Sequence, residues 1–305
     1  MHIGFLNNQL DCRGTGNAIY NYAHYNEEIL GNKSTIYTFS GEKHDAGAYA
    51  KFKDRFKILN TTDGFSKLDA LYHIKSGNND DDDFSPMVPY LVHSVFDNEP
   101  HGTIYATISE WMGERFKLPY VPHIVEIFQT DDDLRNQLNI PKDAIVFARY
   151  GGVDTFTIDF AWDVINELLQ SRDDVYFLFM NTNEPNFPLF DRNRIIFLPS
   201  TVDPYEKRKF INTSDAFLHA RLQGETFGIA VGEFAIAGKP IITYSDSPER
   251  SHLFELGETA YLYNDRISLL DRLKNMPSKQ QIFNTRYMNF TPEKVMNKFK
   301  EVFLI

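Results

Sequence analysis

One continuous stretch of this chain, Asp215 to Thr243, constrains the fold more than any other part of the sequence. It begins with Ala216 to Ala220, a short apolar run typical of a buried parallel strand, and the polar turn Arg221 to Glu225 follows. Apolar residues then recur at helical spacing after Thr226, which we expect to be the N-cap of a helix. Pro240 to Thr243 starts a second strand. This order predicts a β-α-β unit, in which ligand-binding groups lie at the carboxyl ends of the strands.

Two glutamates frame the predicted helix, Glu225 just before it and Glu233 in its third turn. Their separation is slightly more than two helical turns, so both side chains can face the same side. A phosphate at this helix end would meet exposed backbone N–H groups and the positive end of the helix dipole. The alternative is that Glu225 caps its own helix and that Glu233 is a solvated surface charge. Spacing alone does not decide between these two interpretations.

The whole stretch resembles a family signature. It consists of the polar turn, the first glutamate, a helix of small residues, a second glutamate after seven intervening residues, and the segment AGKP that ends the helix. They resemble the E-x7-E motif of retaining glycosyltransferases with the GT-B fold, of the group 1 or family 4-like type. In that family the first glutamate faces the donor sugar and the second holds the ribose of the nucleotide. The resemblance assigns these roles to Glu225 and Glu233.

The resemblance also implies an α/β fold of the GT-B kind, with two doubly wound, Rossmann-like domains that face each other across a cleft. It implies a glycine loop near the donor phosphates, an arginine at the diphosphate and a strand end that reads the nucleotide base. The donor-binding residues expected on this basis are Gly14, Thr15, Gly16, Arg149, Gly151, Gly152, Pro199, Ser200, Arg221, Glu225, Thr226, Phe227, Gly228, Ile229 and Glu233.

Length and charge limit the class of protein. A chain of 305 residues exceeds the usual size of a single core, so two domains are expected. A net charge of -11 argues against a nucleic-acid binder. The single cysteine, Cys12, excludes an intramolecular disulfide and a cysteine-rich zinc site. The start of the chain has no signal-peptide pattern and no segment is long and apolar enough to span a membrane, so we expect a soluble, cytoplasmic protein.

The first half of the chain alternates short apolar runs with polar or helical segments, as an α/β domain requires. Residues 2 to 6 predict its first strand, and the glycine loop with Arg13 then opens a helix. Val88 to Phe96 predicts a strand that carries His93. A histidine in such a strand is more often a neutral core residue than a catalytic one. Related GT-B enzymes place a histidine at the sugar, and on that basis His93, or else His101, is the candidate catalytic histidine.

The domain joint is expected around Pro119 and Pro122, two residues that interrupt regular structure. We therefore expect an acceptor-side domain over residues 1–120 and a donor domain over residues 121–285. The resemblance implies that residues 286–305 form a terminal helix that crosses back to the first domain. The acidic run Asp80 to Asp83 predicts a solvated loop, with metal binding as the less favoured alternative.

Arg149 ends the predicted strand Ala144 to Ala148 and precedes Gly151 and Gly152. A guanidinium at this place could neutralise a departing diphosphate, whereas the alternative is a salt bridge to Asp154 or Asp159. Relatives follow this arginine with a lysine, which the segment GGVDTFTIDFAWD lacks. Arg221 could supply the missing charge.

The sequence thus predicts a retaining glycosyltransferase that passes a sugar from a UDP- or GDP-sugar to a hydroxyl of a glycan or similar acceptor. We expect Glu225, Arg149 and His93 to be catalytic, and neither a metal nor a further cofactor to be required. Two alternatives remain open at this point. One is a nucleotide-sugar epimerase or hydrolase on the same fold, and the other is a catalytically silent, sugar-binding protein.

Overall fold

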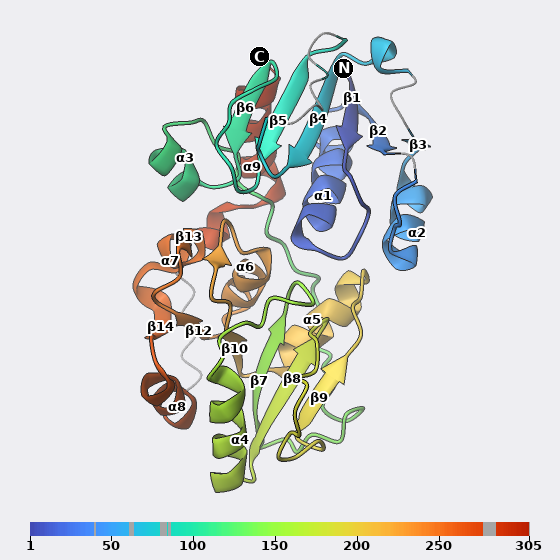
Figure 1. The fold of residues 1–305 in the computed structure, drawn as a ribbon. Helices are drawn as coiled ribbons and strands as arrows, with labels where there is room; N and C mark the ends of the chain where they lie inside the picture. Colours follow the sequence, from blue (N-terminus) through green and yellow to red (C-terminus); the bar gives the residue numbers. More distant parts are fainter. Residues whose placement is uncertain (40, 61–63, 80–83, 85–86, 277–284, 305) are drawn as a thin grey trace. The chain divides into compact units, whose positions relative to one another are not determined.

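A computed structural model describes residues 1–39, 41–60, 64–79, 84, 87–276 and 285–304 of the chain. The acidic run Asp80 to Asp83 lies outside the described residues. The chain divides into two compact units, one formed by Met1–Val125 with Asn289–Ile305 and the other by Glu126–Met288. Each unit contains its own six-stranded sheet (Figure 1). None of the helices in the described residues combines the length and the apolar character that a membrane crossing demands.

The sheet of the first unit is parallel and has the strand order β3-β2-β1-β4-β5-β6. Its strands are β1 (His2–Leu6), β2 (Lys33–Thr38), β3 (Ile58–Asn60), β4 (Ala70–Lys75), β5 (Tyr90–Ser94) and β6 (Ile104–Thr107). Its helices are α1 (Gly14–Glu28), α2 (Ala46–Arg55), the short η1 (Phe65–Lys67), α3 (Glu110–Phe116) and α9 (Pro292–Phe303). The first strand lies where the sequence predicts it, whereas the terminal helix expected over residues 286–305 spans Pro292–Phe303.

An aromatic core joins α1 and α9 to one face of this sheet. The ring of Tyr22 in α1 packs on Tyr72 of β4 and on Phe299 of α9, with centroid distances of 5.5 and 5.3 Å. Phe303 of α9 lies 5.4 Å from the ring of His93 in β5. The terminal helix is therefore part of the first unit's core, although α9 lies at the other end of the sequence from α1 and β1.

The second unit repeats this topology with the strand order β14-β12-β10-β7-β8-β9. Its strands are β7 (Ile145–Tyr150), β8 (Val175–Met180), β9 (Ile195–Leu198), β10 (Ala216–His219), β12 (Ile241–Tyr244) and β14 (Ala260–Tyr263). A separate two-residue ladder joins β11 (Gly224–Glu225) to β13 (Glu249–Arg250). The helices are α4 (Ala161–Ser171), α5 (Pro204–Thr213), α6 (Ile229–Ile236), α7 (Ser251–Leu256), α8 (Arg266–Lys274) and the short η2 (Gly257–Thr259) and η3 (Arg286–Asn289).

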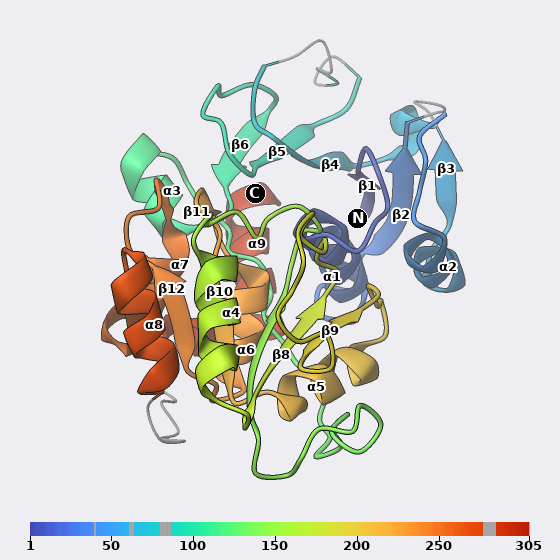
Figure 2. The same cartoon turned by 60° about the horizontal axis from the view of Figure 1, so that its bottom comes forward.

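Helices cover both faces of the second sheet (Figure 2). On one face, Leu168 of α4 and Leu273 of α8 pack in one cluster with Phe177 of β8. On the other face, Phe210 of α5 and Phe234 of α6 surround the ring of Tyr150. Because β7 continues to β8 on one side and β10 to β12 on the other, the strand order reverses between β7 and β10. In open α/β sheets such a reversal is where the carboxyl ends of the strands leave room for a ligand.

Three predicted boundaries are wrong in detail. The helix after β10 begins at Ile229, not after Thr226, because Gly228 is its N-cap and has a left-handed backbone with φ 87°. Glu225 therefore lies in the ladder β11 and not in the helix. Helix α1 starts at Gly14, so the expected glycine loop is the first turn of a helix. Strand β7 extends beyond Arg149 to Tyr150.

Candidate functional site

The residues with the most unusual environments lie at the carboxyl ends of β7 and β10, the two strands that flank the reversal in strand order. Backbone hydrogen bonds tie together the loops that follow these strands. The N–H groups of Thr157 and Ile158 both donate to the carbonyl of Ala220, over 2.8 and 3.1 Å. The side-chain amide of Asn181, which follows β8, adds a 2.7 Å hydrogen bond to the carbonyl of Gly151. The loops after three neighbouring strands thus form one connected edge.

Arg149, the penultimate residue of β7, is a buried cation with neutral partners. Its side chain is only 4% exposed. The guanidinium donates to the hydroxyls of Thr155 and Thr182 and, over 2.9 Å, to the carbonyl of Gly152. Neither Asp154 nor Asp159 is a partner, so the predicted alternative of a salt bridge to one of them is wrong. Burial lowers the pKa of Arg149 to about 10, and the charge of Glu225 acts against this shift.

A buried cation is costly unless an opposite charge compensates it. Glu225 and Asp154 raise the pKa of Arg149, and Arg221 lowers it, so all three charges lie near enough to act on the guanidinium. The three oxygens that accept its hydrogen bonds are uncharged. The guanidinium therefore has a favourable position for an anion that binds at the end of β7.

Glu225 is held on both oxygens. Its Oε1 lies 3.2 Å from His219 Nε2, and its Oε2 accepts a 2.8 Å hydrogen bond from Arg221 Nη1. Burial alone would raise the pKa of Glu225, but the hydrogen bond from His219 and the charge of Arg221 outweigh it and lower the pKa to about 2. The carboxylate is thus ionised and oriented, and it does not cap the following helix. Its side chain remains 23% exposed, which leaves it accessible to a ligand.

Glu233, in α6, is not the solvated surface charge that the sequence left as an alternative. It is 3% exposed. Its Oε2 accepts a hydrogen bond from the hydroxyl of Tyr150, the last residue of β7, and its Oε1 pairs with Lys207 Nζ from α5. Three elements therefore converge on one buried carboxylate.

The start of α6 differs from the sequence prediction. The first-turn N–H groups belong to residues from Gly228 and Ile229 onward, whereas Thr226 and Phe227 precede the helix as buried residues. The carbonyl of Phe227 accepts a 2.7 Å hydrogen bond from the hydroxyl of Tyr287, which holds this segment in place. Since Gly228 has no side chain to cap the helix and its first turn carries no acidic residue, the helix N-terminus is suited to an anion.

Other predicted site residues lie elsewhere in the fold. Gly14, Thr15 and Gly16 are in the first turn of α1, in the first unit. Pro199 and Ser200 follow β9, the edge strand of the second sheet, and both are exposed. Gly151 and Gly152, by contrast, lie in the loop that contacts Arg149.

His93 has the environment of a core residue. It is fully buried, its Nδ1 lies 2.6 Å from the hydroxyl of Tyr72, and its Nε2 lies within hydrogen-bond distance of the carbonyls of Thr107 and Val121. Burial lowers the pKa of His93 to about 4, so it is neutral. Because both ring nitrogens have partners inside the core, His93 is not placed to act as a catalytic group of the candidate site. His101, the substitute, has its Nδ1 2.7 Å from the carbonyl of Glu99.

Sequence analysis missed several polar residues of the second unit. Lys207 and Tyr150 contact Glu233, Thr155 and Thr182 contact Arg149, and His219 contacts Glu225. None of these contacts is readable from the sequence, because the partners meet only through the fold. Among the described residues, no group of three or more histidine, cysteine, aspartate or glutamate side chains could hold a metal ion.

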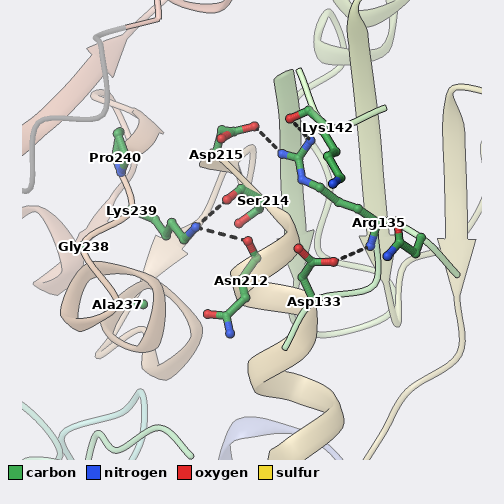
Figure 3. Close-up of a pocket in the computed structure, with 11 residues that line it drawn as sticks. Asp133, Arg135, Lys142, Asn212, Ser214, Asp215, Ala237, Gly238, Lys239 and Pro240 are labelled. Atoms are coloured by element: carbon green, nitrogen blue, oxygen red, sulfur yellow. Dashed lines mark hydrogen bonds and ion pairs between the residues drawn. The ribbon is translucent and has the colours of Figure 1, made fainter. Parts of the chain in front are cut away.

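A pocket of about 490 Å³ lies in the same unit but at the opposite edge of the sheet. It is lined by residues that precede β7, β10 and β12, among them Arg135, Asp215 and Lys239. Arg135 pairs with Asp215 over 2.8 Å, and Lys239 Nζ donates to the carbonyl of Ser214 over 2.5 Å (Figure 3). Arg135 is thus paired with a carboxylate and Lys239 with a backbone carbonyl, and the pocket is separate from the candidate site.

Comparison with solved structures identifies the fold. HepE of Anabaena, in complex with UDP and glucose, matches with a TM-score of 0.73, 12% identity and coverage of 98% of each chain. A glycosyltransferase from Rickettsia africae matches with a TM-score of 0.64 and 12% identity, over 99% of this chain and 94% of that one. A putative UDP-N-acetylglucosamine 2-epimerase from Listeria monocytogenes matches with a TM-score of 0.62 and 12% identity, over 98% and 96%. The predicted GT-B fold with two Rossmann-like units is confirmed. Neither a protein-family model nor the sequence of a curated protein matches the chain.

Proposed function

We propose that this protein is a retaining glycosyltransferase that transfers a sugar from a nucleotide-diphospho-sugar to a hydroxyl of a glycan or similar acceptor. The observation that carries the proposal is Arg149, a buried cation whose hydrogen-bond partners are neutral, placed where the strand order reverses. A diphosphate is the kind of anion that compensates such a group. The N-terminus of α6 offers further N–H donors in the same unit.

In this proposal Arg149 and the start of α6 stabilise the charge that grows on the leaving diphosphate as the glycosidic bond breaks. Preorganised donors in a water-poor site are the largest single contribution to many such reactions. Because protein groups supply this charge, we propose that the transfer requires no metal and no cofactor beyond the donor. Adding a chelator should therefore leave turnover unchanged.

The two glutamates have separate roles. Glu225 is ionised and partly exposed, so it can accept hydrogen bonds from the donor sugar or stabilise positive charge on its ring. Glu233 is oriented by Tyr150 and Lys207, and we assign its carboxylate to the ribose hydroxyls of the nucleotide. Lys207 also brings a second cation to this part of the unit, which lacks the lysine that relatives carry after the arginine.

The structural neighbours support a UDP-sugar as the donor class, since HepE is described in complex with UDP and glucose. A second function, epimerisation of a nucleotide-sugar, rests on one observation, the match to a putative UDP-N-acetylglucosamine 2-epimerase, whose TM-score of 0.62 is lower than the 0.73 of HepE. The environment of Arg149 and Glu225 fits either reaction up to cleavage of the glycosidic bond. The two differ in whether an acceptor hydroxyl then receives the sugar.

A thermal-shift panel of UDP-, GDP- and ADP-sugars tests the donor class. A ligand at about 100 times its dissociation constant should add roughly 2.7 kcal/mol of stability. Product analysis with labelled donor then separates transfer, epimerisation and hydrolysis, and NMR of the product gives the anomeric configuration. Stabilisation by no nucleotide-sugar would contradict the proposal, and an inverted product would contradict the retaining mechanism.

A further inference from the structure

Behind Glu225 lies a row of three buried polar residues from three different elements. His219 ends β10, Thr243 is in β12 and His252 is in α7, and all three side chains are buried. His219 Nε2 lies 3.2 Å from Glu225 Oε1, and His219 Nδ1 lies 2.9 Å from Thr243 Oγ1. The same hydroxyl oxygen lies 3.1 Å from His252 Nε2. The row is continuous from the carboxylate to α7.

The chemistry of the carboxylate determines the direction of the first hydrogen bond. Glu225 is ionised and can only accept, so His219 must donate from Nε2. The hydroxyl of Thr243 then connects the other nitrogen of His219 to His252. Burial lowers the pKa of His252 well below its ordinary value, so this ring is neutral. Because the ring and the hydroxyl are both buried, neither can exchange its hydrogen-bond partner for water. Each hydrogen bond therefore restricts the orientation of the next group.

The backbone connects the same segments. Glu225 pairs with Arg250 in the ladder of β11 and β13, and Arg250 directly precedes α7, which carries His252. Gly224 is required here, because its φ is 74° and a Cβ would approach the carbonyl oxygen of Glu249 to 2.0 Å. The side chain of Glu225 and its backbone are thus both fastened to residues 249–252, a segment that sequence analysis did not assign to the site.

We propose that His219, Thr243 and His252 are positioning residues that set the orientation of the Glu225 carboxylate toward the donor. This inference rests on the proposed function, in which Glu225 faces the donor sugar. With Oε1 held by His219 and Oε2 by Arg221, the carboxylate cannot rotate without breaking a hydrogen bond. All three positioning residues are buried, so in this proposal they act on the reaction through Glu225.

Substitutions at Thr243 test this role. Thr243→Val keeps the shape and removes the hydroxyl, whereas Thr243→Ser keeps the hydroxyl. We expect Thr243→Val to lower turnover by about 10-fold with the donor Michaelis constant changed by less than about 3-fold, since roughly one hydrogen bond is lost in the transition state. Thr243→Ser should recover most of the activity. Thr213→Val is the matched control, because Thr213 is a buried threonine of the same unit outside the row.

A purely structural row would give a different result. Thr243→Val would then lower the melting temperature, as Thr213→Val does, and leave turnover of the folded protein unchanged. The proposal would also be overturned if Thr243→Ser were as inactive as Thr243→Val, because the loss of activity would then not come from the hydroxyl.

NMR of protein labelled with ¹⁵N-histidine examines the row without any donor. We expect His219 to be protonated at Nε2, and Thr243→Val to shift the ring resonances of both His219 and His252. An unprotonated Nε2, or two histidines that respond independently, would overturn the row whatever the enzyme does. If instead the row is present but no nucleotide-sugar binds, the proposed function fails and the row stands as an observation about the fold.

Discussion

The two edges of the second sheet use similar residues in opposite ways. At the amino edge, Arg135 is paired with the carboxylate of Asp215, and Lys239 donates to a carbonyl. At the carboxyl edge, Arg149 is more buried than Arg135, and its guanidinium donates to two hydroxyls and a carbonyl. A buried arginine with a protein carboxylate is complete as folded, whereas one with neutral partners is compensated fully only by a ligand. This difference, more than burial or charge alone, separates a structural edge from a functional one.

The largest effect should come from the amino edge. Arg135→Ala leaves Asp215 buried without its paired cation and removes donors to the carbonyls of Pro141 and Ala144. We expect a loss of about 3 to 5 kcal/mol of unfolding free energy, as for other broken buried pairs. Urea denaturation measures the loss. Turnover per folded molecule should not change, and a selective loss of turnover would show that this edge also serves the reaction.

Arg149→Ala should have the reverse effect, a large loss of turnover with little loss of stability. Removal of one preorganised charge stabiliser lowers turnover by about 100-fold to 1000-fold. Because the interaction strengthens as the diphosphate departs, the turnover number and the specificity constant should fall together, with the Michaelis constant nearly unchanged. Steady-state kinetics on protein with a native circular dichroism spectrum provide the measurement. Full turnover in this variant would remove the distinction between the two edges.

The acid sensitivity of the carboxyl edge should depend on Glu225. Its pKa is lowered from 4.5 to about 2, so its ionised form stabilises the folded state above the unfolded pKa. That contribution is lost as the pH falls through the window between these values. Glu225→Gln, which does not titrate, should therefore show a shallower loss of stability on acidification, by on the order of 2 kcal/mol after solvent screening.

His93 provides a check on this comparison. Its pKa is lowered to about 4, so it also destabilises the protein on acidification, but it does so equally in the wild type and in Glu225→Gln. Urea midpoints measured from pH 7 down to pH 3 separate the two contributions. Identical acid profiles would show that Glu225 gains no stability from His219 and Arg221.

Most strands could be predicted from the sequence, because short apolar runs bounded by turns are a local signal. The strand expected over residues 2 to 6 has the predicted limits. The ladder of β11 and β13 could not be predicted, since two residues carry no periodicity. Because Gly228 has a left-handed backbone, α6 begins later than predicted. No pattern in the flanking residues predicts this backbone conformation.

The site shows the same division. Arg149, Glu225 and Glu233 could be nominated from their positions along the chain together with the family resemblance. Their partners could not, because Tyr150 and Lys207 are 83 and 26 residues from Glu233 in sequence and meet it only through the fold. His93 was instead predicted to be catalytic. The sequence predicts the strand that carries it, but it does not predict the contact of His93 with Tyr72 in the core.

The smallest predicted effect concerns Glu233, the exception to the comparison of edges, because it is a paired buried charge at the carboxyl edge. Tyr150→Phe removes one hydrogen bond to the carboxylate and keeps the ring among its aromatic neighbours. If Glu233 binds the ribose, the looser carboxylate should weaken nucleotide and nucleotide-sugar alike, by about 1 kcal/mol or roughly 5-fold in dissociation constant. If Glu233 is structural, as Asp215 is, the same substitution lowers stability and leaves both affinities unchanged. Calorimetry with the free nucleotide and with the donor, alongside urea denaturation, distinguishes these outcomes, because a ribose contact is common to both ligands while a contact to the sugar is not.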